Sequence, residues 1–423
     1  MSTFALFLVT ILLLVGMHEL GHFLAARLVR IGVIEFAIGF GPTLRAWKRG
    51  KTRYSLRLFP LGGYVRLAGE GWDSGEFPLE ESYYGRPAWA RLLVALAGPA
   101  FNLLLAFVLA FAGLWLIGLP RLRVAGLVPD KPAEKVLQVG DTILAVEGKP
   151  IWSTDEVSPL IQARAPEPVR FQILRDSVPQ EVQVAPVYSE EDGRYVVGAY
   201  FLPQVVLAEL LEVQALTPLS ASGFRSGDRV VEACGRPVRS YLELWGAVEE
   251  GCRTVQVLRG EETLTLTLPE NAAQALAAGK WRTLPMVYGA IGAGRALALA
   301  GQQVGQAVFF VAAAFQALVA RRIPAGEAVS GPVGIAAALA EGLAAGPLVV
   351  LLLIAVISVN LALFNLLPIP ALDGSRLLFA LVELVTRRRV PPRVETLVHT
   401  LGFVLLLGLL VLITARDLLR LFG

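Results

Sequence analysis

The sequence has few charged residues: Asp, Glu, Lys and Arg make up 17% of its 423 positions. An average soluble domain carries about 25% charged residues, so an ordinary water-soluble protein is excluded. Hydrophobic residues reach 55%, and this balance predicts a membrane protein made of several units. The net charge of +3 is too small to indicate binding to nucleic acid, and we expect no nucleic-acid partner.

Cysteine is also scarce, because Cys234 and Cys252 are the only two in the chain. No Cys-x-x-Cys pair exists, which argues against a thiolate zinc cluster or a thioredoxin-like redox site. The two residues could form one disulfide in an oxidising compartment, or they could remain free thiols. The sequence leaves both alternatives open.

Four apolar runs occupy residues 4–29, 89–119, 348–367 and 397–413. Each is close to the roughly 20 residues that a helix needs to cross the hydrocarbon core of a bilayer. They predict about four transmembrane helices. The first run could instead be a cleaved signal peptide, but no Lys or Arg precedes its apolar core, and it continues to residue 29.

A weaker apolar stretch covers residues 296–319 and carries Gln302, Gln303 and Gln306 together on one side. This pattern predicts an amphipathic helix that lies on the membrane or partly in it. A fifth transmembrane helix is the alternative.

Basic residues near the ends of the apolar runs predict the orientation of the chain. One cluster follows the first run, and another lies between the third and the fourth. The clusters are Arg27, Arg30, Arg45, Lys48, Arg49, Lys51, Arg53 and Arg57, and then Arg376, Arg387, Arg388, Arg389 and Arg393. Because cytoplasmic connections are enriched in Lys and Arg, both connections are predicted to be cytoplasmic. The N-terminus and the segment from about residue 120 to 345 are then expected on the outer side.

Residues 120–270 contain short alternating runs typical of strands, and they include an internal repeat. Gly140-Asp141, Gly148 and Pro150 recur as Gly227-Asp228, Gly235 and Pro237. The repeated unit resembles the PDZ domain in its bacterial, protease-associated form. PDZ domains commonly bind an extended peptide as an added strand, but the two modules could equally be spacers or size filters.

The residues with the clearest chemistry are His18 and His22, four positions apart, with Glu19 between them. On a helix this spacing puts both imidazoles on one face, where they can share a zinc ion, and Glu19 can serve as general base. A charged side chain at the centre of a membrane helix costs about 2.5–3.5 kcal/mol, so such a cluster within an apolar run indicates function.

A catalytic zinc usually has three protein ligands, so a third ligand is expected elsewhere in the chain. Pro368 and Pro370 break the helix at the end of the third apolar run. Unwound backbone at membrane depth is tolerated only when it is buried in protein or faces a cavity, so a cavity is expected here. Asp373 follows and would complete the ligand set, although it could instead be a helix N-cap. We expect His399, at the start of the last run, to be an interfacial residue.

Taken together, these motifs resemble the site-2 protease family of intramembrane zinc metalloproteases, in its bacterial type with two PDZ domains. The resemblance rests on the His-Glu-x-x-His motif, on the Asn-x-x-Pro-x-Pro-x-Leu-Asp-Gly motif at residues 365–374, and on Gly98-Pro99-Ala100-Phe101-Asn102. It implies that His18, His22 and Asp373 hold zinc and that Glu19 activates a water molecule. One departure is Ser375, where many relatives carry a second glycine.

The resemblance also implies how a substrate is held. Asn365 would bind the substrate backbone or stabilise the oxyanion, with interhelical hydrogen bonding as the alternative. The residues Gly62, Gly63, Tyr64 and Val65 would belong to a membrane-dipping β-hairpin that offers a strand edge to an unwound substrate helix.

The expected architecture is a polytopic α-helical membrane protein with two inserted PDZ-like, β-rich domains. Residues 1–118 would hold the first two membrane helices and the hairpin, 119–203 and 204–270 the PDZ domains, 271–345 a linker with the amphipathic helix, and 346–423 the last two membrane helices.

The resemblance implies cleavage of single-span membrane proteins in a bacterial inner membrane, such as anti-sigma factors or remnant signal peptides. An upstream site-1-type protease would trim the substrate first. The alternative functions are a PDZ membrane scaffold with a vestigial metal site and, less favoured, a metal transporter.

Overall fold

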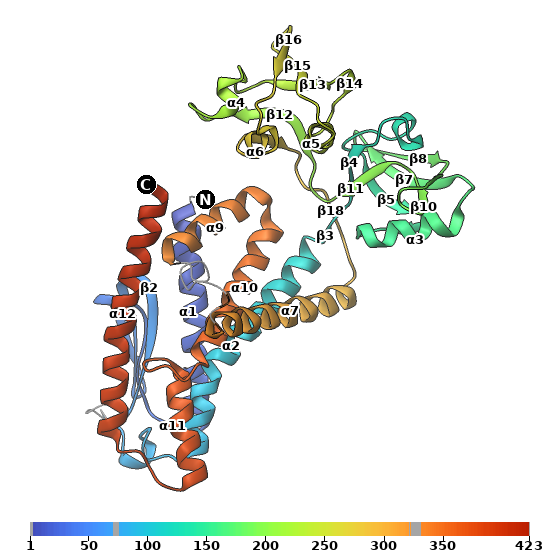
Figure 1. Ribbon diagram of the computed structural model, residues 1–423. Coiled ribbons are helices and arrows are strands. Elements are labelled where there is room, and N and C mark those ends of the chain that lie inside the picture. Colours follow the sequence, from blue (N-terminus) through green and yellow to red (C-terminus); the bar gives the residue numbers. More distant parts are fainter. Residues whose placement is uncertain (1–2, 71–75, 321, 323–330, 423) are drawn as a thin grey trace. The chain divides into compact units, whose positions relative to one another are not determined.

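The computed structural model describes residues 3–70, 76–320, 322 and 331–422, and the chain divides into two compact units. The first unit combines the two ends of the chain, Met1–Gly118 and Ile291–Gly423, and the second is Leu119–Ala290. The helices of the first unit are α1 (Thr3–Leu28), α2 (Ala88–Leu116), α7 (Ala293–Val319), α9 (Pro332–Ala345), α10 (Pro347–Asn365), α11 (Asp373–Thr386) and α12 (Pro392–Phe422), with the short 3-10 helix η1 (Leu79–Glu81) (Figure 1).

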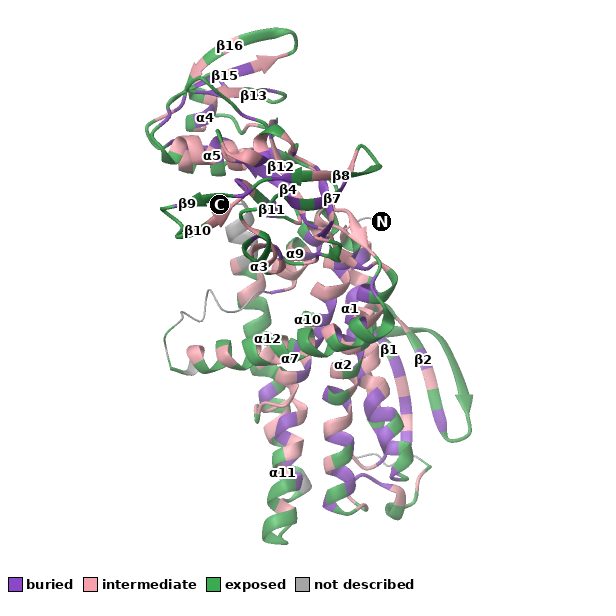
Figure 2. Cartoon of the chain, turned by 90° about the vertical axis from the view of Figure 1, so that its right-hand side faces the viewer, coloured by how far each residue is buried: buried purple, intermediate pink, exposed green. Residues whose placement is uncertain are grey.

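Helix α2 packs against both α1 and α10, and Leu14, Leu105 and Ile354 of these three helices share one buried apolar cluster; buried positions are coloured purple in Figure 2. At Gly21 of α1 a Cβ atom would lie 2.8 Å from the carbonyl carbon of Ala97 in α2, so only glycine allows the two backbones to approach this far. Small residues at helix crossings are the usual way to bring membrane helices together, because lipid supplies no hydrophobic drive for their association.

Five helices within the described residues are long and apolar enough to cross a membrane, namely α1, α2, α7, α10 and α12. The predicted polytopic helical membrane fold is thereby confirmed. Helix α7 is the stretch that we expected to be amphipathic, and by length and composition it also qualifies as the alternative fifth span. Figures 1 and 2 show α7 running across α2 and α10 rather than along them.

The predicted hairpin is wider than a simple pair of strands, because one strand pairs with two different parts of the other. Strand β1 (Val33–Arg49) and strand β2 (Thr52–Leu67) pair in more than one register, so that Ala37 of β1 lies opposite both Tyr64 and Ser55 of β2. Residues 33–38 therefore lie between two parts of β2. In the pairing of the described residues, 63–67 contact this sheet on one side only and form its edge.

The second unit contains two β-rich domains with the same strand arrangement. In the first, β4 (Arg123–Leu127), β5 (Thr142–Val146), β7 (Val169–Arg175), β8 (Val178–Val184) and β11 (Ala199–Leu202) follow the order β11-β4-β5-β7-β8, with α3 (Thr154–Arg164). In the second, β12 (Val206–Glu212), β13 (Arg229–Ala233), β15 (Thr254–Arg259), β16 (Glu262–Thr267) and β17 (Lys280–Thr283) follow the corresponding order β17-β12-β13-β15-β16, with α5 (Tyr241–Glu249). The predicted pair of PDZ-like domains is present.

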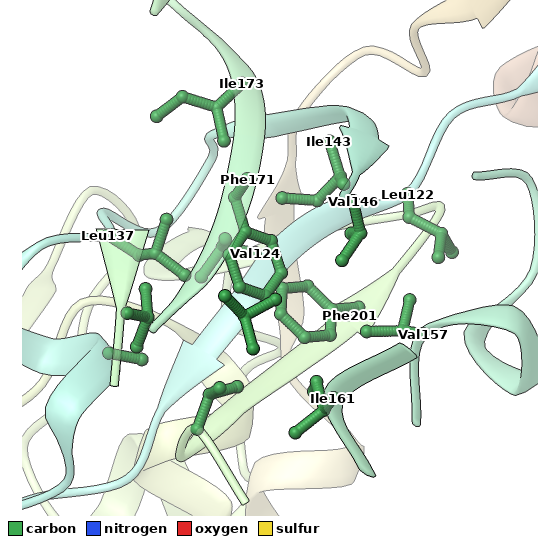
Figure 3. Close-up of a cluster of buried hydrophobic side chains, with 14 of the residues drawn as sticks. Leu122, Val124, Leu137, Ile143, Val146, Val157, Ile161, Phe171, Ile173 and Phe201 are labelled. Carbon is green, nitrogen blue, oxygen red and sulfur yellow. The ribbon is translucent and has the colours of Figure 1, made fainter. Parts of the chain in front are cut away.

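Shorter elements complete this unit. They are β3 (Leu119–Pro120), η2 (Pro132–Lys135), β6 (Lys149–Pro150), β9 (Val187–Ser189), β10 (Arg194–Val196), α4 (Pro218–Ala221), β14 (Arg236–Pro237), α6 (Ala272–Ala277) and β18 (Tyr288–Gly289). The core of the first PDZ-like domain is built from alternating strand residues such as Phe171 and Ile173, which pack on Val124, Phe201 and Ile161 (Figure 3).

The repeated Gly-Asp motif has the same structural role in both domains. Asp141 accepts hydrogen bonds from Arg175 Nη2 at 2.6 Å and from a main-chain N–H, and Asp228 accepts one from Arg259 Nε at 2.7 Å and another main-chain bond. Both carboxylates are buried. In each domain, a buried aspartate therefore accepts hydrogen bonds from one arginine and from one main-chain N–H, and these bonds stabilise the domain.

The second domain extends beyond residue 270, where the sequence places its end. Strand β17 pairs with β12 at residues 280–283, inside the predicted linker of residues 271–345, because a long-range pairing decides its place and local composition does not show it. The other predicted boundaries stay predictions. Cys234 and Cys252 form a disulfide, which decides between the two alternatives that the sequence left open.

Candidate metal centre

The structure brings together His18 and His22 of α1 and Asp373, the first residue of α11. His18 Nε2 lies 2.9 Å from Asp373 Oδ2, His22 Nε2 lies 3.1 Å from the same oxygen, and the two Nε2 atoms are 3.1 Å apart. The ligand atoms of a tetrahedral zinc with bonds of about 2.0–2.1 Å are ~3.3 Å apart. The cluster therefore fits zinc in donor type, in number and in spacing.

The outer nitrogen atoms of both imidazoles face α2. His22 Nδ1 donates to the carbonyl oxygen of Val94 at 2.8 Å, and His18 Nδ1 lies 3.2 Å from the side-chain amide of Asn102. Contacts of this kind fix the ring orientation of metal-binding histidines. Both Nε2 atoms consequently point to the centre of the cluster.

Gly98 of α2 provides the space that the two imidazoles occupy. A Cβ atom there would lie 2.6 Å from His22 Cε1 and 2.8 Å from His18 Cε1, well inside van der Waals contact. The sequence offered Gly98 only as part of a family motif. The structure gives its physical reason, because no other residue leaves room for the rings.

The chain before Asp373 folds back on itself to place the carboxylate. Ala371 has a φ of 74°, a left-handed conformation that is costly for a residue with a side chain, and such strain is concentrated at functional sites. A Cβ atom on Gly374 would lie 2.5 Å from the carbonyl carbon of Leu366, so the glycine is required. Leu372 occupies the N-cap position of α11, and the Asp373 carboxylate is directed at the histidines.

The departure at Ser375 has a simple local explanation. Its hydroxyl donates to the carbonyl oxygen of Leu372 at 2.8 Å, within the first turn of α11. The extra side chain is satisfied by its own turn and leaves the metal cluster undisturbed.

A cavity of about 330 Å³ opens beside the cluster. Glu19, Tyr64, Val65 and Asn365 line it together with the three candidate ligands. Gly63 lies next to the base, since a Cβ atom on it would be 3.6 Å from Glu19 Cγ. The structure thus gathers these predicted residues, whereas Gly62 is buried against Phe40 and does not line the cavity.

Arg376 also lines this cavity, and the sequence analysis missed it as a site residue. It forms an ion pair with Glu70, just beyond β2, and so connects α11 to the end of the sheet. Its position three residues after Asp373, on the same face of α11, is the signal that could have found it. His399 lies in a neighbouring cavity of about 430 Å³, beside Ser375 and outside the metal cluster.

The chain matches the sequence model of Peptidase family M50 over residues 6–409. It belongs to this family. The resemblance to the site-2 proteases is thereby confirmed, and together with the His18, His22 and Asp373 cluster it identifies the chain as a zinc metalloprotease.

Full-length relatives agree with this assignment. A protein of Thermotoga maritima named as a zinc metalloprotease is 29% identical over 98% of this chain and 99% of its own length. A Clostridium perfringens protein with a similar name is 30% identical, covering 98% of this chain and 97% of the relative. The regulator of sigma-E protease RseP of Salmonella typhimurium is 28% identical, covering 99% and 98%.

Among solved structures, the PDZ domain of an SdrC-like protein from Listeria monocytogenes is similar to part of the chain. It is 19% identical, with a TM-score of 0.19, and the match covers 20% of this chain and 88% of that domain.

Proposed function

We propose that the protein is an intramembrane zinc endopeptidase that cleaves the transmembrane segments of single-span membrane proteins. The observation that carries the proposal is a buried His18, His22 and Asp373 cluster held by apolar helices, with Glu19 beside it and a strand edge along its cavity. A substrate segment must enter this helical assembly to reach the cluster, which suits a peptide that is itself within the membrane.

The roles of the residues follow from their positions. His18, His22 and Asp373 would hold the zinc ion, which supplies Lewis acidity and a water molecule of lowered pKa. Glu19 takes the proton of the attacking water and returns it to the leaving amine. Asn365, at the end of α10, has an amide N–H that can donate to the developing oxyanion.

The strand edge at residues 63–67 gives the unwound substrate a partner. A transmembrane helix hides its amides in its own hydrogen bonds, so the segment that is cut must become extended first. Extended peptide can then pair with the free main-chain groups of the edge, as in strand addition. Gly63 supports this role, because it leaves no side chain between the edge and Glu19.

The chain is a multi-pass membrane protein, and we propose that the PDZ-like pair lies on the outer side of a bacterial inner membrane. The Lys and Arg clusters support this orientation, and so does the disulfide between Cys234 and Cys252, since disulfides persist in oxidising compartments. The metal centre then lies towards the cytoplasmic side. Anti-sigma factors and remnant signal peptides, already trimmed by a site-1-type protease, are the substrates that this arrangement suits.

A second candidate function is a membrane scaffold that binds peptides through its PDZ-like domains. A cavity of about 920 Å³ beside α3 and β11 in the first PDZ-like domain favours peptide binding. The scaffold function competes with the protease proposal only if the metal site is vestigial. The complete set of candidate ligands, with Glu19 beside it, argues against a vestigial site.

The decisive experiment replaces Glu19 by Gln in the full chain and measures zinc content and cleavage of a single-span substrate in proteoliposomes. We expect zinc content equal to that of the parent and a loss of cleavage of at least about 10²-fold, because only the proton transfer is removed. Glu181→Gln, at an exposed position of β8, is the matched control and should cleave normally. Normal cleavage by Glu19→Gln, or a parent protein without zinc, would overturn the proposal.

A further inference from the structure

We infer that Asn102 is a positioning residue for the metal centre: its side-chain oxygen accepts a hydrogen bond from His18 Nδ1–H and so keeps His18 Nε2 directed at zinc. The inference rests on the proposed function, since it concerns the same metal centre. It adds a residue of α2, a helix that contributes no candidate ligand.

The first observation is the contact itself. Asn102 Nδ2 lies 3.2 Å from His18 Nδ1, and both residues are buried, Asn102 completely. The second observation is that Asn102 Oδ1, also buried, has no hydrogen-bond partner among the described residues. A buried amide oxygen without a partner is uncommon and requires an explanation.

One rotation of the amide pairs the Asn102 oxygen with the Nδ1–H of His18. If His18 binds zinc through Nε2, its Nδ1 carries the hydrogen and is a donor. A donor facing the Nδ2 donor of Asn102 cannot form a hydrogen bond. The oxygen and nitrogen of an amide have nearly the same shape, so turning the group by 180° places Oδ1 against Nδ1–H at the same distance. The oxygen then gains a donor and the mismatched contact disappears, while the amide nitrogen takes the position in which the oxygen had no partner.

The neighbouring histidine shows the same arrangement with a different acceptor. His22 Nδ1 donates to the main-chain carbonyl of Val94, also in α2. Both imidazoles are therefore oriented by acceptors on one helix, and Asn102 is the acceptor that substitution can remove. Its main-chain oxygen accepts a hydrogen bond from the hydroxyl of Ser358 in α10 at 2.8 Å, a contact in which the side-chain amide takes no part.

The rival assignment leaves Asn102 Nδ2 as donor to a bare Nδ1, which puts the hydrogen of His18 on Nε2 and prevents zinc binding there. Asn102→Asp separates the two assignments, because a carboxylate accepts hydrogen bonds and cannot donate them when ionised. Under the inference Asp replaces the oxygen, as in the carboxylate–histidine–zinc arrangement found in other enzymes. Under the rival assignment Asp is as harmful as an apolar residue.

The experiment measures the zinc affinity of the purified full chain by competition with a chelator, next to cleavage of a single-span substrate. We expect Asn102→Leu to weaken zinc binding about 10- to 100-fold and Asn102→Asp to stay within a few-fold of the parent. Ser358→Ala, which removes the bond to the Asn102 main chain alone, is the matched control and should bind zinc like the parent. Should Asn102→Leu fail to fold, Asn102→Ala takes its place.

Unchanged zinc affinity in Asn102→Leu would overturn the inference, and so would an equal loss in Asn102→Leu and Asn102→Asp. A merely structural role predicts that equal loss, because it gives Asp no advantage over Leu. A parent protein that neither binds zinc nor cleaves would instead overturn the proposed function, so the two failures are distinguishable.

Discussion

Replacing Gly98 by Ala should disable the metal centre while leaving the helical fold in place. The added Cβ would lie 2.6 Å from His22 Cε1, whereas ordinary contact begins at 3.4 Å. The ring or the helix must therefore move by about 0.8 Å, and metal–ligand distances tolerate only about ±0.2 Å. Neither backbone can yield easily, because Gly21 already brings α1 into contact with α2.

The cost to folding should be modest, since overpacking typically destabilises by about 1–3 kcal/mol. The assay compares zinc affinity by chelator competition with thermal unfolding of the metal-free protein. Gly16→Ala in α1 is the matched control, because a Cβ there meets nothing within 4 Å and should bind zinc normally. If Gly98→Ala bound zinc and cleaved substrate like the parent, the close packing described for the centre would be wrong.

Two further predictions concern the PDZ-like domains, both followed by hydrogen exchange of the full chain, corrected for intrinsic rates. Arg259→Met leaves the buried Asp228 carboxylate without its ion-pair partner and should destabilise the second domain by roughly 3 kcal/mol. Arg236→Met removes an exposed ion pair and should destabilise it by less than about 1 kcal/mol. Equal losses of stability in the two variants would contradict the role given to the Gly-Asp motif. In the first domain, the main-chain N–H and the guanidinium of Arg170 hold the pKa of Glu147 below its ordinary value of about 4.3. The resulting stability is present above that ordinary value and is lost as the pH falls through the lowered pKa. Glu147→Gln should therefore lower protection at pH 7 and make little difference at strongly acidic pH; a pH-independent difference would refute this.

The sequence predicted the helices and the repeat because both depend on local information. Length and apolar composition identify a membrane helix, and the paired Gly-Asp motifs identify two copies of one unit. The metal cluster could be proposed for a chemical reason, since two histidines need a third ligand and Asp373 lay in a broken helix. The structure brings the ligand atoms of these three residues within 4.8 Å of one another.

What the sequence could not show depends on contacts between distant segments. Arg175 and Arg259 are ordinary strand residues until each is seen paired with a buried aspartate. The edge at residues 63–67 follows from the folding of β2 around both sides of β1, which no alternation of side chains reveals. The requirement at Gly98 arises only where two helices cross, so it cannot be derived from either helix alone.

These contacts give α2 a function that cannot be predicted from its own sequence. The candidate ligands come from α1 and α11, yet α2 supplies the space at Gly98, the acceptor at Val94 and the amide of Asn102. His22 and Asp373 are 351 residues apart in the sequence, so another element must hold their two segments in a fixed relative position. Helix α2 is suited to that task because it packs against α1, α10 and α11 at once. Substitutions on the inner face of α2 should therefore affect zinc binding before they affect folding, and those on its outer face should affect neither.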